Sequence, residues 1–531
     1  MKADLTRNTF DPLKHFTRVL MQQGRVQLDA DWNEQAAILL KYLQSLAADL
    51  IGPHGGPIAN LGFRIAEGNV ATDLALSPGH YYVNGILCEL TSPSAPVPIS
   101  KANPAGQTNE FQIPPSAVAS FTKNQLVLLD AEGQSPLLLT TIQSVAKAGL
   151  VTVTVSDGSD VSKILSASNP HAYPKFVTYL TQPDYPLPAG TKLAQGSSLV
   201  YLDVWERLIT YVEDDSIREV ALNGADTAAR TKLVCQVKQM PPVTPPQTVD
   251  NITADDLKKQ LQPPNRGLLM AQAKQTSTST DPCVIAPDAS YRGPENQLYR
   301  VEIHTGAGAG LTPTFKWSRE NGSVVFPIIN FSTSSARAAG SGGTTTVVLE
   351  NLDRDDRFGL TENDWVEMQD DNSVLLNNAG NLLQVQSIDS ANLTVTLAGT
   401  PSTNLDQTKH PLLRRWDQTF GDPAQGGLQA GPDNAALPME GTWLSLEDGV
   451  QIQFQAAPSG STNLYRTGDY WLIHARTATG DIEWPTGASG PLALPPNGVD
   501  HHYAPLAVIK VDSSVEVTVL CQQQFQPMPP A

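Results

Sequence analysis

The first regular pattern along the chain is a helical one, between residues 31 and 50. Asp31 is placed to cap the free backbone amides, and Glu34, three residues later, to complete a capping box, so we expect the helix to begin there. Gly52 and Pro53 end it. Apolar side chains recur at intervals of three and four residues along one side of this helix, at Trp32, Ala36, Leu39, Leu40, Leu43, Leu46, Ala47 and Leu50. This side needs a partner, which is either the rest of its own domain or another subunit.

After Pro57 the pattern changes to short apolar runs between turns, which is typical of β-strands. In the segment 79–87, for example, Asn84-Gly85 supplies the positive φ angles of a tight hairpin turn. Glycine (39) and proline (41) are both frequent among the 531 residues, which favours turns and strands over long helices. We therefore predict a mainly β, multidomain fold, with several small barrel or sandwich modules and an N-terminal amphipathic helix.

Two segments far apart in the sequence resemble each other. Residues 125–130, 142–145 and 150–155 alternate between apolar and polar positions as half-buried strands do, and residues 364–370, 385–388 and 393–397 repeat their order and spacing almost unchanged. One interpretation is two β modules of one design, each with its own meander. The other is a chance similarity of short β segments.

Proline-rich segments suggest where the chain divides. Met240 to Pro246 and Gln262 to Pro264 flank a polar stretch, 250–260, that we expect to form one small helix within a connector. The predicted organisation is an N-terminal docking arm (1–57), a first β module (58–175), a β segment (176–240), a proline-rich connector (241–285), a second β module (286–420) and a C-terminal β module (421–531).

Charge and composition narrow the classes of partner. The formal net charge is −18, so nucleic acid is an unfavourable partner. We find no membrane span, because the apolar stretch 36–50 is interrupted by Lys41 and Asp49. The segment 1–12 does not open the apolar run of a secretory signal, which predicts synthesis and assembly in the cytoplasm. The four cysteines are far apart in sequence, and we interpret them as small buried thiols.

The motifs that would carry chemistry fail on their details, so we predict no enzyme, no cofactor and no metal. The segment 29–40 begins like a calcium loop, but Glu34 stands where the sharp turn needs glycine and Leu40 cannot coordinate. Gly306 to Gly310 leads into a strand-like pattern rather than the helix that a dinucleotide site requires. His501 and His502 are adjacent, so on a strand they point to opposite faces.

Tryptophan and arginine occur together in three strand-like runs, 201–207, 315–320 and 413–417. Both residue types are enriched at interface hot spots, because they bury a large area and still make directed hydrogen bonds. We therefore count six of these residues as candidate subunit contacts, with ion pairs inside the chain as the alternative. They are Trp205, Arg207, Trp317, Arg319, Arg415 and Trp416.

The start of the chain, 1–7 and 19–35, resembles the DUF6519 domain proteins, an uncharacterised bacterial family. The blocks 201–207, 217–222, 315–325 and 465–471 resemble the same family, so the likeness covers nearly the whole chain. Family members are associated with phage-tail-like contractile injection systems, and the block 24–35 and the hairpin 79–85 are similar to phage tail and baseplate proteins. The resemblance implies a structural component of such a particle and no catalytic residues.

The resulting hypothesis is a baseplate- or spike-proximal part of a contractile injection apparatus. Its partners would be baseplate, spike or tube proteins and further copies of itself. The predicted contacts in the arm are Arg25, Trp32, Ala36, Leu39, Leu43 and Leu46. The rival hypotheses are a carbohydrate- or surface-recognition module and a glycan-cleaving enzyme carried by such a particle.

Overall fold

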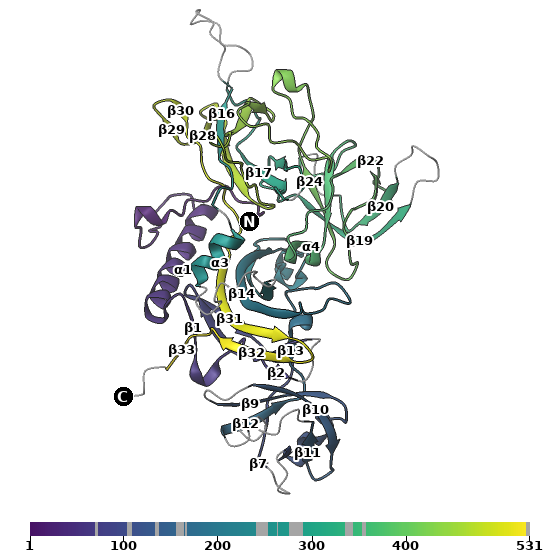
Figure 1. Ribbon diagram of the computed structural model, residues 1–531. Helices are drawn as coiled ribbons and strands as arrows, with labels where there is room; N and C mark the ends of the chain where they lie inside the picture. The colour runs from purple at the N-terminus through teal and green to yellow at the C-terminus, as the bar shows by residue number, and fades with distance from the viewer. Residues whose placement is uncertain are drawn as a thin grey trace, which may run out of the picture. The chain divides into compact units, whose positions relative to one another are not determined.

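The computed structural model describes residues 1–68, 73–102, 109–132, 137–154, 164, 167–240, 253–262, 264–274, 290–308, 310–334, 343–352 and 357–526 (Figure 1). The fold is mainly β, as the sequence predicts, with several sheets and a long N-terminal helix. The chain forms two compact units, and each is built from separate stretches of sequence. Unit 1 comprises Met1–Ile38, Arg207–Lys232 and Pro263–Val499, and unit 2 comprises Leu39–Glu206, Leu233–Gln262 and Asp500–Ala531. This organisation differs from the linear series of modules expected above, since the segment 421–531 contributes to both units.

The centre of unit 2 is an antiparallel ladder of long strands. In order across the sheet these are β15 (Arg230–Met240), β14 (Gly196–Ile209), β31 (His502–Val511) and β32 (Val515–Leu520). The pairing of β14 with β31 joins residues about 300 positions apart, from Gly196 opposite Val511 to Val204 opposite His502. A short helix, α3 (Ala254–Leu261), packs on β31 and buries Leu257 completely. Thr253 and Asp256 cap α3 reciprocally.

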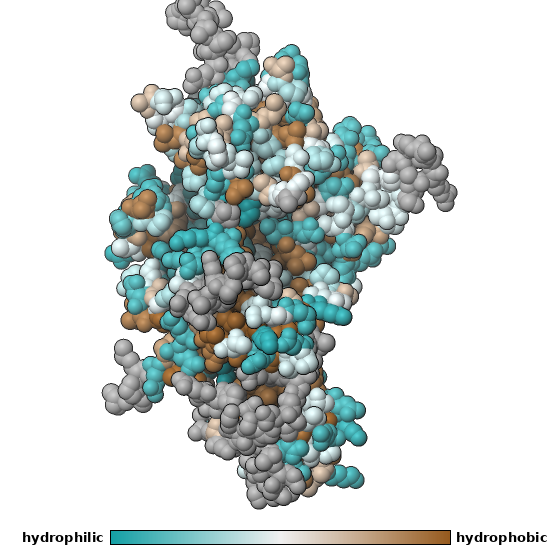
Figure 2. Space-filling model, viewed as in Figure 1, coloured by the Kyte–Doolittle hydropathy of each residue, from teal (hydrophilic) through white to brown (hydrophobic). Residues whose placement is uncertain are grey.

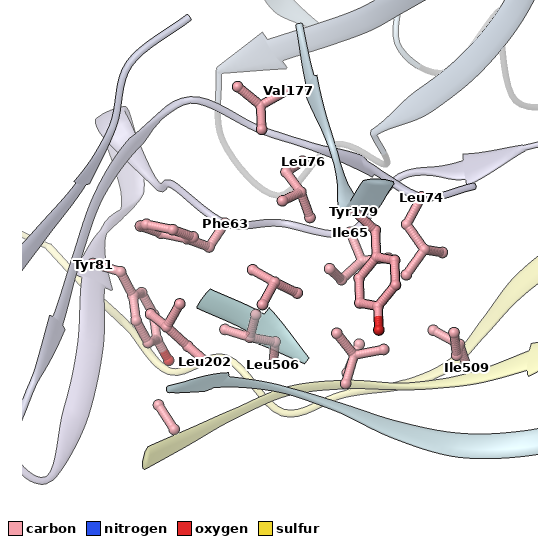
Figure 3. Close-up of a cluster of buried hydrophobic side chains, with 14 of the residues drawn as sticks. Phe63, Ile65, Leu74, Leu76, Tyr81, Val177, Tyr179, Leu202, Leu506 and Ile509 are labelled. Carbon is pink, nitrogen blue, oxygen red and sulfur yellow. The ribbon is translucent and has the colours of Figure 1, made fainter. Parts of the chain in front are cut away.

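The main core of unit 2 lies between this ladder and the loops and short strands around residues 61–83 and 177–187 (Figure 3). Leu202 of β14 and Leu506 of β31 point toward Phe63 and Tyr81 from the opposite side. Tyr179 closes the other end beside Leu74. Burial of these large apolar side chains supplies the main stabilising term for this unit.

A small sheet of unit 2 supports the N-terminal helix. Its strands, in order, are β33 (Gln524–Phe525), β1 (His54–Pro57), β4 (Gly79–Val83) and β5 (Ile86–Leu90). Asn84 and Gly85 form the turn between β4 and β5, with φ angles of 50° and 76°, as the hairpin prediction requires. The long helix α1 (Asp29–Ile51) comes immediately before β1 in the chain.

Helix α1 begins two residues earlier than the sequence predicts. Asp31 lies in the first turn, where its carboxylate accepts a hydrogen bond from the Leu28 backbone nitrogen at 3.4 Å. Glu34 accepts instead from the hydroxyl of Thr9 at 2.5 Å, so the predicted capping box is not formed. Asp31 and Glu34 therefore bind the chain that precedes the helix, instead of capping the helix as the sequence predicts.

Unit 1 contains a closed six-stranded barrel, which we call the second barrel (325–416). Around the circle its strands are β19 (Val325–Ser334), β20 (Thr344–Leu349), β23 (Thr394–Ala398), β22 (Leu383–Asp389), β21 (Trp365–Gln369) and β24 (Leu412–Trp416). Between β21 and β22 runs a short helix, α4 (Asp371–Leu375), with a reciprocal cap between Asp370 and Ser373. Side chains that alternate inward along the strands fill the barrel interior.

Unit 2 contains an open version of the same barrel, which we call the first barrel (97–173). Its strands follow the same order, with one strand broken into two short pieces: β7 (Lys101–Ala102), β8 (Glu110–Gln112), β11 (Leu150–Val153), β10 (Leu138–Val145), β9 (Leu126–Glu132), β12 (Ser168–Tyr173) and β6 (Val97–Pro98). Together β6 and β7 take the place of β19, which pairs with both of its neighbours in the second barrel.

The two barrels agree residue by residue, and not only in strand order. The middle strand of each meander carries a bulge at the same point, after Ile142 in the first barrel and after Val385 in the second. The Ile99 nitrogen donates to the Pro170 carbonyl at 2.9 Å, and the Ile328 nitrogen donates to the Pro411 carbonyl at the same distance. The similarity seen in the sequence thus extends to the strand order of a whole barrel, and duplication as its origin stays a prediction.

The rest of unit 1 consists of two small sheets around an aromatic core. One has the order β18 (Thr314–Ser318), β17 (Gln297–Thr305), β27 (Tyr470–Arg476) and β28 (Asp481–Glu483), and the other β16 (Leu269–Ala273), β26 (Val450–Phe454) and β25 (Leu444–Ser445). Phe454 contacts Phe315, Tyr465 and Trp471 through tilted or edge-on rings. As expected, a strand and not a helix follows the glycines after β17. Much of the predicted connector, namely residues 241–252, 263 and 275–285, lies outside the described residues.

Candidate assembly surface

Helix α1 exposes the apolar stripe that an ordinary amphipathic helix would bury. Trp32 is 60% exposed, Leu39 52%, Leu43 60%, Leu46 47% and Leu50 73%, while only Ala30 and Ile38 of the whole helix are buried. Ala36 and Arg25 are exposed as well. Among the residues that the structure describes, the predicted contacts in the N-terminal segment therefore all lie at the surface.

The spacing of these residues distinguishes them from other exposed apolar side chains. Figure 2 shows apolar residues, in brown, among polar ones on one face of the molecule, which is normal for a protein surface. On α1, Trp32, Ala36, Leu39, Leu43, Leu46 and Leu50 follow one another at alternating steps of four and three. That is the a/d pattern of helices that pack along one another. Leu40 and Tyr42, 47% and 68% exposed, widen the stripe.

The opposite face of α1 is held against the β4–β5 turn. A Cβ atom built on Gly85 would lie 1.9 Å from the carbonyl oxygen of Gln44, so the helix backbone touches the turn directly. No other residue type fits there, because a side chain would both collide with the helix and require the left-handed conformation of Gly85. The hairpin predicted from the sequence is thus the support of the helix.

The chain before α1 is an extended arm, residues 1–28, with one short 3₁₀ turn at Pro12–Lys14. Hydrogen bonds tie the arm to the first turns of α1. The nitrogen and the hydroxyl of Thr6 both donate to Asp29, the nitrogen at 3.0 Å, the Thr9 hydroxyl donates to Glu34, and the Val19 nitrogen donates to Gln35 at 2.7 Å. Its large apolar side chains remain exposed, namely Leu13, Phe16, Leu20, Met21, Val26 and Leu28.

The six tryptophans and arginines predicted as subunit contacts lie mostly inside the chain. Five of them, Trp205, Arg207, Trp317, Arg415 and Trp416, are buried within the chain, and Arg319 is half-buried. Arg207 pairs with Asp371 at 2.6 Å, and Arg319 pairs with Glu447 at 2.8 Å. The two arginines thus make the ion pairs inside the chain that the alternative stated. A role of these six residues in subunit contacts stays a prediction.

A buried cluster of charges stands at the centre of unit 1. The carboxylate of Glu302 lies 2.5 Å from Arg300 and 3.6 Å from Lys316, and the Lys316 ammonium lies 2.5 Å from Glu367. Each of these four side chains is at most 4% exposed. Trp416 donates its indole N–H to Glu367 at 3.0 Å, and its ring lies 4.5 Å from the Lys316 ammonium. Sequence analysis missed the cluster, although Lys316 between Phe315 and Trp317 in an apolar strand was the available signal.

The first residues of the arm complete this cluster. The Lys2 ammonium lies 2.9 Å from Glu302 and 5.6 Å from the centre of the Trp416 ring. Asn321 donates to the carbonyls of Met1 and Ala3 at 3.1 and 2.8 Å, and Arg300 donates to that of Met1 at 3.3 Å. We call this set of groups around Met1–Ala3 the lysine socket: Arg300, Glu302, Asn321 and Trp416.

Burial and neighbouring charges shift the pKa values in the cluster. Burial lowers the pKa of Lys2 to about 8, although Glu302 opposes this effect. Burial alone would raise the pKa of Glu302, but Lys2 and Arg300 hold it well below its usual range. In the same way Lys316 overcomes the effect of burial and holds the pKa of Glu367 at about 2. The carboxylates therefore stay ionised and paired.

Other candidate sites have structural explanations. His501 bonds to Asp203 at 2.6 Å, whereas His502 lies near Asn84 and Asp500, so the adjacent histidines face different partners. Among the described residues, no group of three histidine, cysteine, aspartate or glutamate side chains could hold a metal ion. Within the same residues, no helix is long and apolar enough to cross a membrane.

A cavity of about 580 Å³ opens at one end of the second barrel. Its lining includes Phe331, Thr333, Thr400 and Leu405, together with Thr403, whose hydroxyl is buried without a hydrogen-bond partner. The lining therefore offers both apolar and hydrogen-bonding groups to a small ligand.

Comparison with known proteins gives a family but no function. No curated protein matches the chain. The sequence profile of a family of unknown function, DUF6519, matches residues 1–108, 178–264 and 262–528. The match includes α1, the hairpin and the second barrel, and it leaves out residues 109–177, which make up most of the first barrel. Because the match covers most of its length, the chain belongs to the DUF6519 family.

Proposed function

We propose that this protein is a structural component of a phage-tail-like contractile injection particle, close to the baseplate or spike, and that it joins its neighbours through α1. The particle itself is suggested by the resemblance of residues 24–35 and 79–85 to tail and baseplate proteins. In this proposal the chain assembles in the cytoplasm, and its copies follow the symmetry of the particle.

The observation that carries the proposal is the exposed stripe on α1. Leu39, Leu43 and Leu46 are each about half exposed, and exposing apolar surface to water is unfavourable in free energy. The other face of the helix already contacts the turn at Gly85. A contiguous exposed apolar surface of this kind marks an interaction site. A protein that packs against a helix of a neighbour would recover the cost on assembly.

The buried charges favour a structural role over catalysis. Glu302 and Glu367 are the carboxylates at the centre of unit 1, and both are committed to ion pairs below the surface. A general acid or base must reach its substrate and exchange protons near its working pH. Glu302 and Glu367 do not meet these conditions, so they fit the structural role proposed here, and the absence of enzymatic activity stays a prediction.

The test is particle incorporation of a stripe variant in the bacterium that produces the protein. The triple variant Leu39→Ser, Leu43→Ser, Leu46→Ser changes only exposed side chains, so the fold should remain. The matched control is Val220→Ser with Leu222→Ser, which removes apolar side chains that are 87% and 62% exposed elsewhere. We expect the wild type and the control to sediment with particles and the stripe variant to remain free. Normal incorporation of the stripe variant would reject docking through α1.

The second candidate is a recognition module, which the cavity at the end of the second barrel supports. Its Phe331 ring and threonine hydroxyls offer one apolar surface and several hydrogen-bonding groups. Glycan-array binding that is lost in Phe331→Ala, together with absence of the wild type from particles, would favour this function over assembly.

A further inference from the structure

We propose that the lysine socket of unit 1 is a peptide-binding site that takes the Met1-Lys2-Ala3 segment of a second copy of this chain. In the structure the socket holds the segment of its own chain. The inference goes beyond the assembly role proposed for α1, because it concerns a different surface and a different ligand.

The socket binds both the backbone and the side chain of its ligand. Asn321, 1% exposed, donates through one amide group to the carbonyls on either side of Lys2, at 3.1 and 2.8 Å. Glu302 receives the lysine ammonium at 2.9 Å, and Trp416 supplies an aromatic ring beside it. The Glu302 carboxylate and the Trp416 ring both favour a cation, and the contacts of Asn321 fix the backbone on either side of it. Together they select a lysine at the second position of the ligand.

An empty socket does not leave the Glu302 carboxylate without a cationic partner. When Lys2 leaves, Glu302 still has Arg300 at 2.5 Å and Lys316 at 3.6 Å. The large cost that usually follows the removal of one partner from a buried ion pair is therefore avoided. Lys2 itself keeps 23% of its side chain exposed, so it enters from the surface and can leave by the same route.

The arm is built to reach another copy. Twenty-eight residues precede α1, and an extended chain of that length spans on the order of 90 Å. Between the socket and α1 the arm is bonded to the helix through Thr6, Thr9 and Val19, and it exposes six large apolar side chains. Gly24, with a φ of 70° and open space around it, lies in a turn next to α1 where the arm can change direction.

Exchange between copies has a low cost, because the contacts in the socket are the same in both arrangements. Only the chain concentration and the entropy of the arm decide between them. In a particle that holds copies side by side, exchange would link each unit 1 to the arm of its neighbour.

The first experiment uses the full chain with Lys2→Met and a fluorescent peptide of residues 1–12. We expect this variant to bind the peptide at least tenfold more tightly than the wild type, whose socket is already occupied. A peptide with Lys2→Met should bind at least tenfold more weakly than the natural peptide, and this control changes nothing in the protein. Equal binding of the two peptides, or no binding at 100 µM, would overturn the proposal.

The second experiment asks whether the ligand comes from a second copy. Native mass spectrometry of the wild-type chain at increasing concentration should show dimers, and an excess of the natural peptide should reduce them at least fivefold. The Lys2→Met peptide should leave them unchanged. Peptide binding without dimers that the peptide displaces would overturn the assignment to a second copy. Both outcomes are independent of the stripe on α1, so failure here and failure of the proposed function can be told apart.

Discussion

Asn124 and Asn363 make the same hydrogen bond in two different barrels. The Asn124 nitrogen donates to the Ile142 carbonyl, and the Asn363 nitrogen donates to the Val385 carbonyl, both at 2.8 Å. Both asparagines have the left-handed backbone conformation, with φ angles of 67° and 77°. Because each carbonyl belongs to the residue just before the bulge, the asparagine fixes the point at which the meander bends.

We predict that Asn124→Ala and Asn363→Ala each destabilise their own barrel by about 1 kcal/mol, since alanine is strained in the left-handed conformation. Asn124→Gly and Asn363→Gly should be close to neutral, because glycine adopts it without strain. Hydrogen exchange of the amides in each barrel measures the two effects separately. Unequal responses at the two sites would show that the shared geometry does not reflect a shared role.

The family profile leaves out most of the first barrel. The profile stops at residue 108 and resumes at 178, while the barrel runs from Val97 to Tyr173. The second barrel lies inside the matched region. We therefore interpret the first barrel as a copy of the family's own barrel, inserted between β5 and β14.

The chain enters and leaves the first barrel at one point, which makes a deletion practical. The Ser94 hydroxyl donates to the Lys175 carbonyl at 2.9 Å and accepts from the Lys175 nitrogen at 3.2 Å. We predict that replacing residues 95–174 with a short Gly-Ser linker leaves the rest of the protein folded, as measured by near-UV circular dichroism. The melting temperature should fall by a few degrees, because Ala66 and Ala75 lose the apolar contacts of Leu128 and Tyr173. Loss of all cooperative melting would contradict an inserted module.

Local signals predicted much of the fold. The period of the apolar residues identified α1, the Asn84-Gly85 pair identified the hairpin turn, and the alternation in 125–155 and 364–397 identified two meanders. The pairing of β14 with β31 was not predictable, since it joins segments that share no local signal. For the same reason the sequence could not show that the two compact units draw on interleaved stretches of chain.

The candidate site was predicted in part. The stripe on α1 was found because regular spacing is visible in one dimension, but its exposure depends on what packs nearby. The burial of Trp317 and Trp416 was not predictable for the same reason, because residue type alone does not distinguish a surface hot spot from a core side chain. The lysine socket was missed because Lys2, Glu302 and Trp416 are hundreds of positions apart.

The buried His304 should make unit 1 less stable in acid. Burial, helped by Lys316, lowers the pKa of His304 to about 4 from 6.5, and its other charged neighbours are Glu302, Glu367 and Asp433. The unfolded chain therefore binds a proton between pH 6.5 and 4 that the folded chain does not bind, so stability falls as the pH falls through this range. Over this range the free energy of unfolding falls by roughly 3 kcal/mol.

Replacing this histidine by a ring that cannot ionise isolates its contribution. We predict that the difference in unfolding free energy between His304→Phe and the wild type shifts in favour of the variant by roughly 3 kcal/mol from pH 7 to pH 4. Urea unfolding at several pH values measures this difference. If it is constant with pH, His304 is protonated as easily in the folded chain as in the unfolded one.

The contact between Gly85 and α1 provides a final prediction with a matched control. Gly85→Ala should destabilise the protein by at least 2 kcal/mol, because its Cβ would meet the Gln44 carbonyl at 1.9 Å in addition to the strain of a φ near 76°. Gly24→Ala has a similar φ of 70° but open space around it, so only the backbone strain of about 1 kcal/mol should remain. Thermal unfolding of the two variants separates collision from strain. If they lose the same stability, α1 can move away from the turn at no cost, and the exposed stripe does not depend on the hairpin for its support.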